Sequence, residues 1–141
     1  MKPIKIIVTG ASGRMGQTII KKVLSNKSLK LIGVTEGSKN KFIGSDISEL
    51  IKSKKTGIII TDKIEPLFAK ADAVIDFTVP IATLNHAEMA AKYKIVHVIG
   101  TTGFSPSDEK KISLAAKKAT IIKSGNMSMG INILQQVINK T

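Results

Sequence analysis

The chain has 141 residues, 43% of them hydrophobic, which suits one domain with a buried core and excludes a disordered segment. It contains no cysteine, so a disulfide framework and thiolate metal sites are excluded, and no apolar run approaches the ~20 residues of a membrane helix. Residues 1–5 show no signal-peptide pattern, and we expect a soluble, cytoplasmic protein.

The net charge of +12 comes almost entirely from lysine, because Arg14 is the only arginine among the 22 basic residues. The lysines are scattered, and only 4% of the residues are aromatic. Base recognition favours arginine, and single-strand binding favours aromatic side chains between the cations. The composition therefore indicates solvated helix faces with no nucleic-acid and no membrane partner, although the charge can attract an anionic cofactor.

The first predicted elements contain the most informative motif. An apolar strand at residues 4–8 leads into three glycines at a spacing of three, Gly10, Gly13 and Gly16, and a helix is predicted at residues 15–24. A strand, a tight glycine turn and a helix start are typical of a dinucleotide-binding fold. The spacing departs from the usual GxGxxG pattern, so an ordinary turn is the alternative.

Each glycine has an expected part in holding a pyrophosphate. Gly10 would allow the tight turn, Gly13 would let the backbone approach the phosphates, and Gly16 would let the helix pack closely on the sheet. The N–H groups and the dipole of the helix start favour an anion, and Arg14 adds a cation beside them.

The second predicted strand, residues 29–34, is followed by Glu36. An acid at about this distance from the glycine turn accepts hydrogen bonds from the adenosine ribose hydroxyls, which favours NAD. Lys39 and Lys41 follow closely and could neutralise a 2′-phosphate, so the choice between NADH and NADPH stays open. A surface acid without a ligand is the alternative.

The remaining apolar runs alternate with helix patterns. They are near-continuous, as in strands buried on both faces of a parallel sheet. Further strands are predicted at residues 57–60, 73–77, 96–99 and 120–123, and further helices at residues 45–51, 66–70, 80–92, 106–118 and 129–140. This alternation predicts an α/β fold, a Rossmann-type doubly wound parallel sheet with helices on both faces.

Three segments follow predicted strands, at the edge where open parallel sheets bind ligands. They are residues 76–78, the Gly-Thr-Thr-Gly segment at 100–103, and residues 124–128. The glycines allow backbone approach, the threonines offer hydroxyl groups, and Asn126 could bond a nicotinamide amide. The alternatives are a plain loop at residues 100–103 and a helix cap at Asn126 or Ser128.

The two histidines, His86 and His97, have no partner ligands at metal spacing, which favours structural roles and predicts no metal site. The sequence also shows no paired carboxylates and no nucleophile with a base. We therefore expect a cofactor site without catalytic residues in this chain.

Six motifs support a family resemblance. They are GASGRMG at residues 10–16, IGSD at 43–46, DFT at 76–78, LNH at 84–86, VIGTTGF at 98–104 and GNMSMGIN at 125–132. In this order and spacing they resemble the dihydrodipicolinate reductases of the diaminopimelate route to lysine. The resemblance implies reduction of a cyclic imine dicarboxylate by NADH or NADPH; another amino-acid-pathway dehydrogenase is the nearest alternative.

The resemblance also implies how the cofactor is held: the pyrophosphate by residues 10–15, the adenosine ribose by Glu36, and the nicotinamide by residues 100–103. Thr102 would also reach the substrate. The expected cofactor-binding residues are Gly10, Ala11, Ser12, Gly13, Arg14, Met15, Glu36, Phe77, Gly100, Thr101, Thr102, Ser124, Gly125, Asn126 and Met127. The arginine that usually follows the ribose-binding acid is replaced by Gly37, which argues against a strong NADP preference.

The family's substrate domain, with its histidine- and lysine-containing motif and most of the tetramer interface, has no counterpart in these residues. We therefore expect a dinucleotide-binding domain at residues 1–128 and, at residues 129–141, the start of a helix leading into that absent domain. The chain alone is expected to be inactive, and the full-length protein to be a homotetramer. A non-catalytic dinucleotide-binding module is the alternative.

Overall fold

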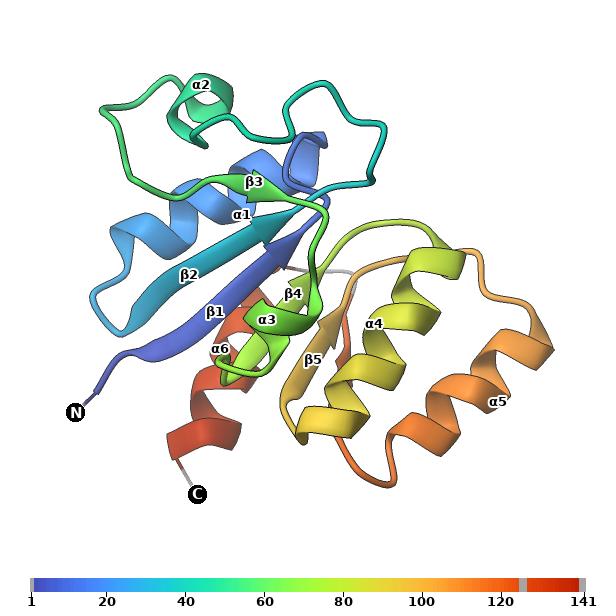
Figure 1. The fold of residues 1–141 in the computed structure, drawn as a ribbon. Helices are drawn as coiled ribbons and strands as arrows, with labels where there is room; N and C mark the ends of the chain where they lie inside the picture. Colours follow the sequence, from blue (N-terminus) through green and yellow to red (C-terminus); the bar gives the residue numbers. More distant parts are fainter. Residues whose placement is uncertain (1, 125–126, 140–141) are drawn as a thin grey trace.

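A six-stranded parallel sheet organises the structure, a computed structural model that describes residues 2–124 and 127–139 (Figure 1). The strands are β1 (Ile4–Thr9), β2 (Leu29–Thr35), β3 (Ile60–Thr61), β4 (Ala73–Asp76), β5 (Val96–Ile99) and β6 (Thr120–Lys123). They lie in the order β3-β2-β1-β4-β5-β6, and each neighbouring pair is parallel. The strand order reverses between β1 and β4, and a crevice beyond the carboxyl ends of such strands is where ligands bind.

Helices cover both faces of the sheet. They are α1 (Arg14–Ser25), α2 (Ser48–Ile51), α3 (Glu65–Phe68), α4 (Pro80–Tyr93), α5 (Pro106–Ala115) and α6 (Met127–Asn139). One apolar core joins the strands to α1, α2 and α6 through Ile19, Ile51 and Leu134. A second core, on the other face, includes Phe68 of α3 and Ala90 of α4. The predicted doubly wound α/β architecture is therefore confirmed.

Two predicted elements differ from the structure. Residues 57–60 were expected to form a strand, but β3 begins only at Ile60. The residues before it bond instead to the segment that precedes α2: the N–H of Ile47 donates to the carbonyl of Ile58, and the N–H of Ile60 donates to the carbonyl of Ser45. Asp46 holds this pairing, since its carboxylate accepts the Gly57 N–H at 2.7 Å. The helix expected at 106–118 begins after Ser105, whose side chain forms a capping box with Asp108, but it ends at Ala115.

The turn between β1 and α1 is tightly closed around its glycines. Gly10 has a φ of +74°, in the left-handed region that side chains disfavour. A Cβ on Gly16 would lie 2.0 Å from the carbonyl oxygen of Gly10, so α1 packs directly against the turn that precedes it. This contact fixes where the first turn of α1 points.

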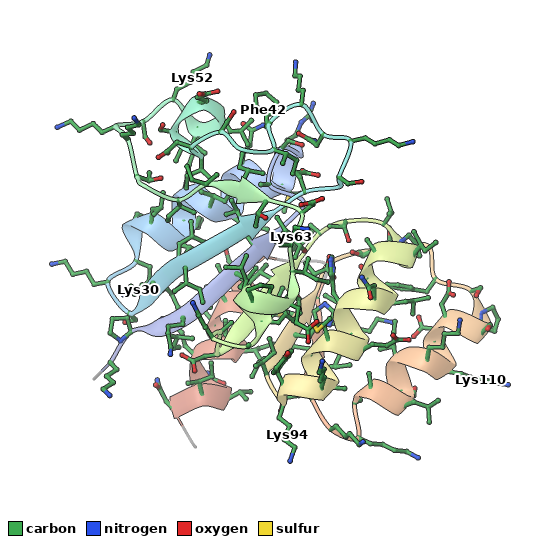
Figure 2. All side chains as sticks on the ribbon, viewed as in Figure 1. Lys30, Phe42, Lys52, Lys63, Lys94 and Lys110 are labelled. Atoms are coloured by element: carbon green, nitrogen blue, oxygen red, sulfur yellow. The ribbon has the colours of Figure 1, made fainter. Side chains whose placement is uncertain are left out.

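The basic side chains extend from many elements into solvent. Figure 2 labels Lys30 on β2, Lys52 after α2 and Lys110 on α5, which project outward at separate places. In the described part of the chain, no helix has the length and apolar character needed to span a bilayer.

We expect Gly16→Ala to lower the free energy of unfolding by about 2–3 kcal/mol, because the added methyl group meets backbone and cannot be relieved by a rotamer change. Urea unfolding followed by circular dichroism measures the loss. Gly37→Ala is the matched control, since a Cβ at Gly37 meets no atom within 4 Å. Equal stability of the two variants would contradict the packing described for α1.

Candidate functional site

The start of α1 presents unpaired backbone donors. In the described part of the chain, the N–H groups of Arg14, Met15 and Gly16 have no hydrogen-bond acceptor, and Gln17 is the first residue of α1 whose N–H reaches a carbonyl, that of Gly13. Gly13 at the N-cap has no side chain to satisfy them. Three free N–H groups, the positive end of the helix dipole and the Arg14 charge make a site for an anion such as a phosphate.

Glu36 lies across the mouth of this turn. Its Oε2 accepts hydrogen bonds from the backbone N–H of Ser12 at 2.7 Å and from the Ser12 hydroxyl at 2.6 Å. Asn40 in turn donates its side-chain amide to the Ser12 hydroxyl at 3.0 Å. The carboxylate is therefore held in place at the end of β2, and it can accept further hydrogen bonds from a ligand's hydroxyl groups.

A cleft of about 700 Å³ opens beside the turn and Glu36. Its walls are the glycine turn, the residues after β2, Asp62 and Ile64 after β3, and residues 77–79 with the first half of α4. Small-molecule sites usually have volumes of ~300–1,000 Å³. A larger open groove of about 1010 Å³ lies between α4 and α5, rimmed by lysines such as Lys111 and Lys118, and no residue of the segments at 76–78, 100–103 or 124–128 is among its lining residues.

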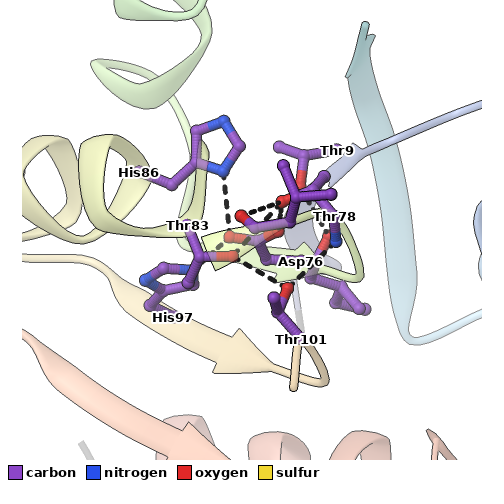
Figure 3. Close-up of polar contacts among 9 residues, drawn as sticks. Thr9, Asp76, Thr78, Thr83, His86, His97 and Thr101 are labelled. Atoms are coloured by element: carbon purple, nitrogen blue, oxygen red, sulfur yellow. Dashed lines mark hydrogen bonds and ion pairs between the residues drawn. The ribbon is translucent and has the colours of Figure 1, made fainter. Parts of the chain in front are cut away.

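A buried polar network underlies the α4 wall of the cleft (Figure 3). Asp76, the last residue of β4, is fully buried, and its Oδ2 accepts hydrogen bonds at 2.9 Å from His86 Nδ1 and from His97 Nε2. Its Oδ1 accepts the Thr78 hydroxyl at 2.7 Å. His86 comes from α4 and His97 from β5, so one carboxylate joins three elements.

Hydroxyl groups extend this network to the loop after β5. The Thr101 hydroxyl accepts the backbone N–H of Thr78 at 3.0 Å and the Thr83 hydroxyl at 2.8 Å. Thr83 lies on α4 and is fully buried. The loops that follow β4 and β5 are therefore fastened to each other and to α4 by side chains that do not face solvent.

The network keeps Asp76 charged and His97 neutral. Burial alone would raise the pKa of the Asp76 carboxyl, but the hydrogen bonds from His86 and His97 outweigh it and hold that pKa well below its usual range. Burial lowers the pKa of His97 and outweighs the nearby carboxylate. His97 Nδ1 is buried without a partner, which suits an unprotonated nitrogen on a neutral ring.

The structure brings half of the predicted cofactor residues to one place. Gly10, Ser12, Gly13, Glu36 and Phe77 line the cleft. Arg14 and Met15 are exposed at the start of α1, and Ala11 is buried behind the turn. These positions agree with the predicted phosphate and ribose site.

The other predicted residues follow β5 and β6 in the sequence, and those that the structure describes do not line the cleft. Thr101 is buried in the network, Thr102 is exposed, and Gly100 packs so closely under Phe77 that a Cβ there would lie 2.0 Å from the ring. The N–H of Ser124 bonds the carbonyl of Ile99 at 2.9 Å. Gly125 and Asn126 lie outside the described residues, and Met127 begins α6. Their roles stay predictions.

Sequence reasoning missed the α4 wall and the network beneath it. His86, assigned a structural role, does bond Asp76, but it also lines the cleft together with Asn85. Asp62 and Ile64 carried no motif. The usable signal was the pairing of DFT at 76–78 with LNH at 84–86, which places an acid at a strand end and a histidine on the following helix.

Comparison with known proteins supports the family resemblance that the sequence motifs indicate. A family model described as "Dihydrodipicolinate reductase, N-terminus" matches residues 4–127. The 4-hydroxy-tetrahydrodipicolinate reductase of Brucella abortus (strain 2308) is 49% identical over 135 residues, covering 96% of this chain and 50% of that protein. The enzyme of the same name from Parvibaculum lavamentivorans is 48% identical over 138 residues, covering 97% of this chain and 51% of that protein.

A solved structure agrees with the fold. The dihydrodipicolinate reductase of Paenisporosarcina sp. TG-14, determined with bound dipicolinate, superposes with a TM-score of 0.69 at 26% identity, covering 88% of this chain and 48% of that one. The chain spans about half the length of the curated relatives it matches.

The lowered pKa values of the buried His97 and Asp76 side chains predict how the stability of the fold depends on pH. Because the His97 pKa is lowered from 6.5, the unfolded chain binds a proton below about pH 6.5 that the folded chain does not, so stability falls as the pH drops. The Asp76 pKa is lowered from 3.8, which adds a second loss below that pH. We expect the free energy of unfolding to decrease from pH 7 to pH 5, with a slope of at most ~1.4 kcal/mol per pH unit from His97.

Urea unfolding at pH 7, 6 and 5 measures this slope. His97→Gln keeps an N–H donor for Asp76 but cannot take up a proton, so its stability is expected to change less over the same range. Identical slopes for the wild-type chain and His97→Gln would refute the assignment of a neutral His97.

Proposed function

We propose that this chain, which belongs to the dihydrodipicolinate reductase N-terminal family, binds NADH or NADPH as the cofactor domain of a reductase. The observation that carries the proposal is the set of three unpaired N–H groups at the start of α1, with Glu36 fixed at the mouth of the same turn. Such donors suit a pyrophosphate, and such an acceptor suits ribose hydroxyls. The residues present therefore fit a dinucleotide.

The proposed reaction is the reduction of a dihydrodipicolinate-type cyclic imine in diaminopimelate and lysine biosynthesis. When bound, the dinucleotide supplies the hydride. The residues of this chain would bind and orient it: the turn and Arg14 for the pyrophosphate, Glu36 for the adenosine ribose, and the segment after β5 for the nicotinamide. The names of the relatives and the shared motifs support this substrate class.

We further propose a division of labour within a longer protein. Residues 1–128 would form the dinucleotide-binding domain, and residues 129–141 would begin a helix leading to a substrate and tetramerisation domain. That domain would hold and protonate the imine, and the whole would act as a cytoplasmic homotetramer with no nucleic-acid or membrane partner. The proposal is supported by the share of the relatives that this chain covers, about half.

The first test is binding. NADH added to the purified chain should give enhanced nicotinamide fluorescence and a saturable calorimetric signal. Gly13→Asp should weaken binding by at least about tenfold, because it places a carboxylate beside the phosphates. Ser107→Asp is the matched control, because it adds a carboxylate in the first turn of α5, outside the cleft walls. Absence of binding of both NADH and NADPH at millimolar concentration would overturn the proposal.

We propose that NADH is preferred over NADPH. Among the described residues Glu36 forms no ion pair, and the neighbouring Lys41 instead lies over the Phe42 ring, 5.2 Å from its centroid. A 2′-phosphate beside the ribose would therefore face this unpaired carboxylate, with Lys39 rather than Lys41 left to offset the repulsion.

Glu36→Gln should shift the ratio of the two dissociation constants toward NADPH by about tenfold, because it removes this repulsion while keeping an acceptor oxygen. Glu49→Gln makes the same charge change on α2, outside the cleft walls, and should leave the ratio unchanged. Calorimetric titration of each variant with both cofactors gives the ratio. Equal ratios for Glu36→Gln and Glu49→Gln would remove Glu36 from cofactor selection.

A further inference from the structure

One wall of the cleft has no part in the function proposed so far. It faces Glu36 and consists of residues from the start of α4, among them Ala82, Asn85 and His86, together with Asp62 and Ile64 after β3. No described residue from the loops after β5 or β6 lines the cleft. The cleft therefore corresponds to the adenosine half of a dinucleotide, with the nicotinamide half expected beyond it, over β5 and β6.

The His86 ring on this wall has a fixed orientation. Its Nδ1 lies 2.9 Å from the Asp76 carboxylate, which can only accept, so Nδ1 carries the hydrogen. The Phe68 ring lies against the imidazole with 5.9 Å between the centroids, and Phe68 is fully buried. Asp76 is itself held by His97 and Thr78. The hydrogen bond to Asp76 and the contact with the Phe68 ring therefore hold the imidazole in one orientation.

The second nitrogen of His86 is an unused acceptor. In a neutral imidazole that carries its hydrogen on Nδ1, Nε2 has a lone pair. Within the described residues His86 Nε2 forms no hydrogen bond. Among these residues, His97 Nδ1 is the only side-chain nitrogen or oxygen that is both buried and without a partner. His86 Nε2, which also lacks a partner, is therefore not fully buried. Figure 3 shows this nitrogen on the side of the ring away from Asp76. Since His86 lines the cleft, the lone pair is open to a ligand there.

We propose that His86 Nε2 accepts a hydrogen bond from the exocyclic amine of the adenine base, which makes His86 a base-selecting residue and Asp76 its positioning residue. This inference rests on the proposed binding of a dinucleotide in the cleft. The exocyclic amine is the only N–H donor on the adenine ring of a bound dinucleotide. A base with a carbonyl oxygen at that position would meet the lone pair of His86, and relieving this repulsion would require either a tautomer without the bond to Asp76 or the uptake of a proton on Nε2.

The test compares NADH with reduced nicotinamide hypoxanthine dinucleotide, which replaces that amine by a carbonyl group. We expect the wild-type chain to bind NADH about tenfold more tightly than the hypoxanthine analogue, as measured by calorimetry. His86→Met removes the acceptor and should bring the two dissociation constants within about twofold of each other. His86→Gln offers an amide oxygen at a similar reach and should restore the preference for NADH.

His97→Gln is the matched control, because His97 bonds the same Asp76 oxygen but is fully buried and does not line the cleft. Its preference for NADH should equal that of the wild-type chain, whereas a purely structural role for the network would change both histidine variants alike. Equal binding of the two dinucleotides by the wild-type chain, or an unchanged preference in His86→Met, would overturn the inference alone. Absence of binding to either dinucleotide would overturn the proposed function as well.

Discussion

A buried carboxylate, hydrogen-bonded by two imidazoles and one hydroxyl group, holds together the ligand edge of this sheet. Moving an ionised group into the interior is costly unless hydrogen bonds replace the lost water. Asp76 obtains three, two from imidazole N–H groups and one from the Thr78 hydroxyl. Because each donor comes from a different segment, the same bonds that keep the charge solvated also fix the loop after β4 and strand β5 against α4.

The turn after β1 differs from this network, because it leaves polar groups without hydrogen-bond partners. There the polar groups at the start of α1 are left without partners, and the exposed backbone of residues 14–15 keeps them in contact with solvent. A helix start without a side-chain cap is less stable than a capped one, as the capping box on α5 illustrates by contrast. The fold therefore combines a buried carboxylate whose two oxygens are hydrogen-bonded with a turn whose donors are free for an anion.

The features that could be predicted from the sequence were the local ones. The β1 turn and the start of α1 depend on residues within a few positions of each other, and the structure has them as predicted. The start of β3 was misplaced because Asp46 binds Gly57 across an eleven-residue loop, a contact with no periodic signal. The Asp76 network was equally hidden: it needs the register that pairs Val74 of β4 with His97 of β5, so that Asp76 and His97 share one face of the sheet.

The contact between Phe77 and Gly100 limits how this edge of the sheet can vary. The Phe77 ring occupies the space that a side chain at position 100 would need, and a Cβ there would lie 2.0 Å from it. The two positions are 23 residues apart, yet a side chain at position 100 requires the Phe77 ring to move or to be replaced by a smaller group. Variants of this domain with a larger residue at position 100 should therefore tend to carry a smaller one at position 77.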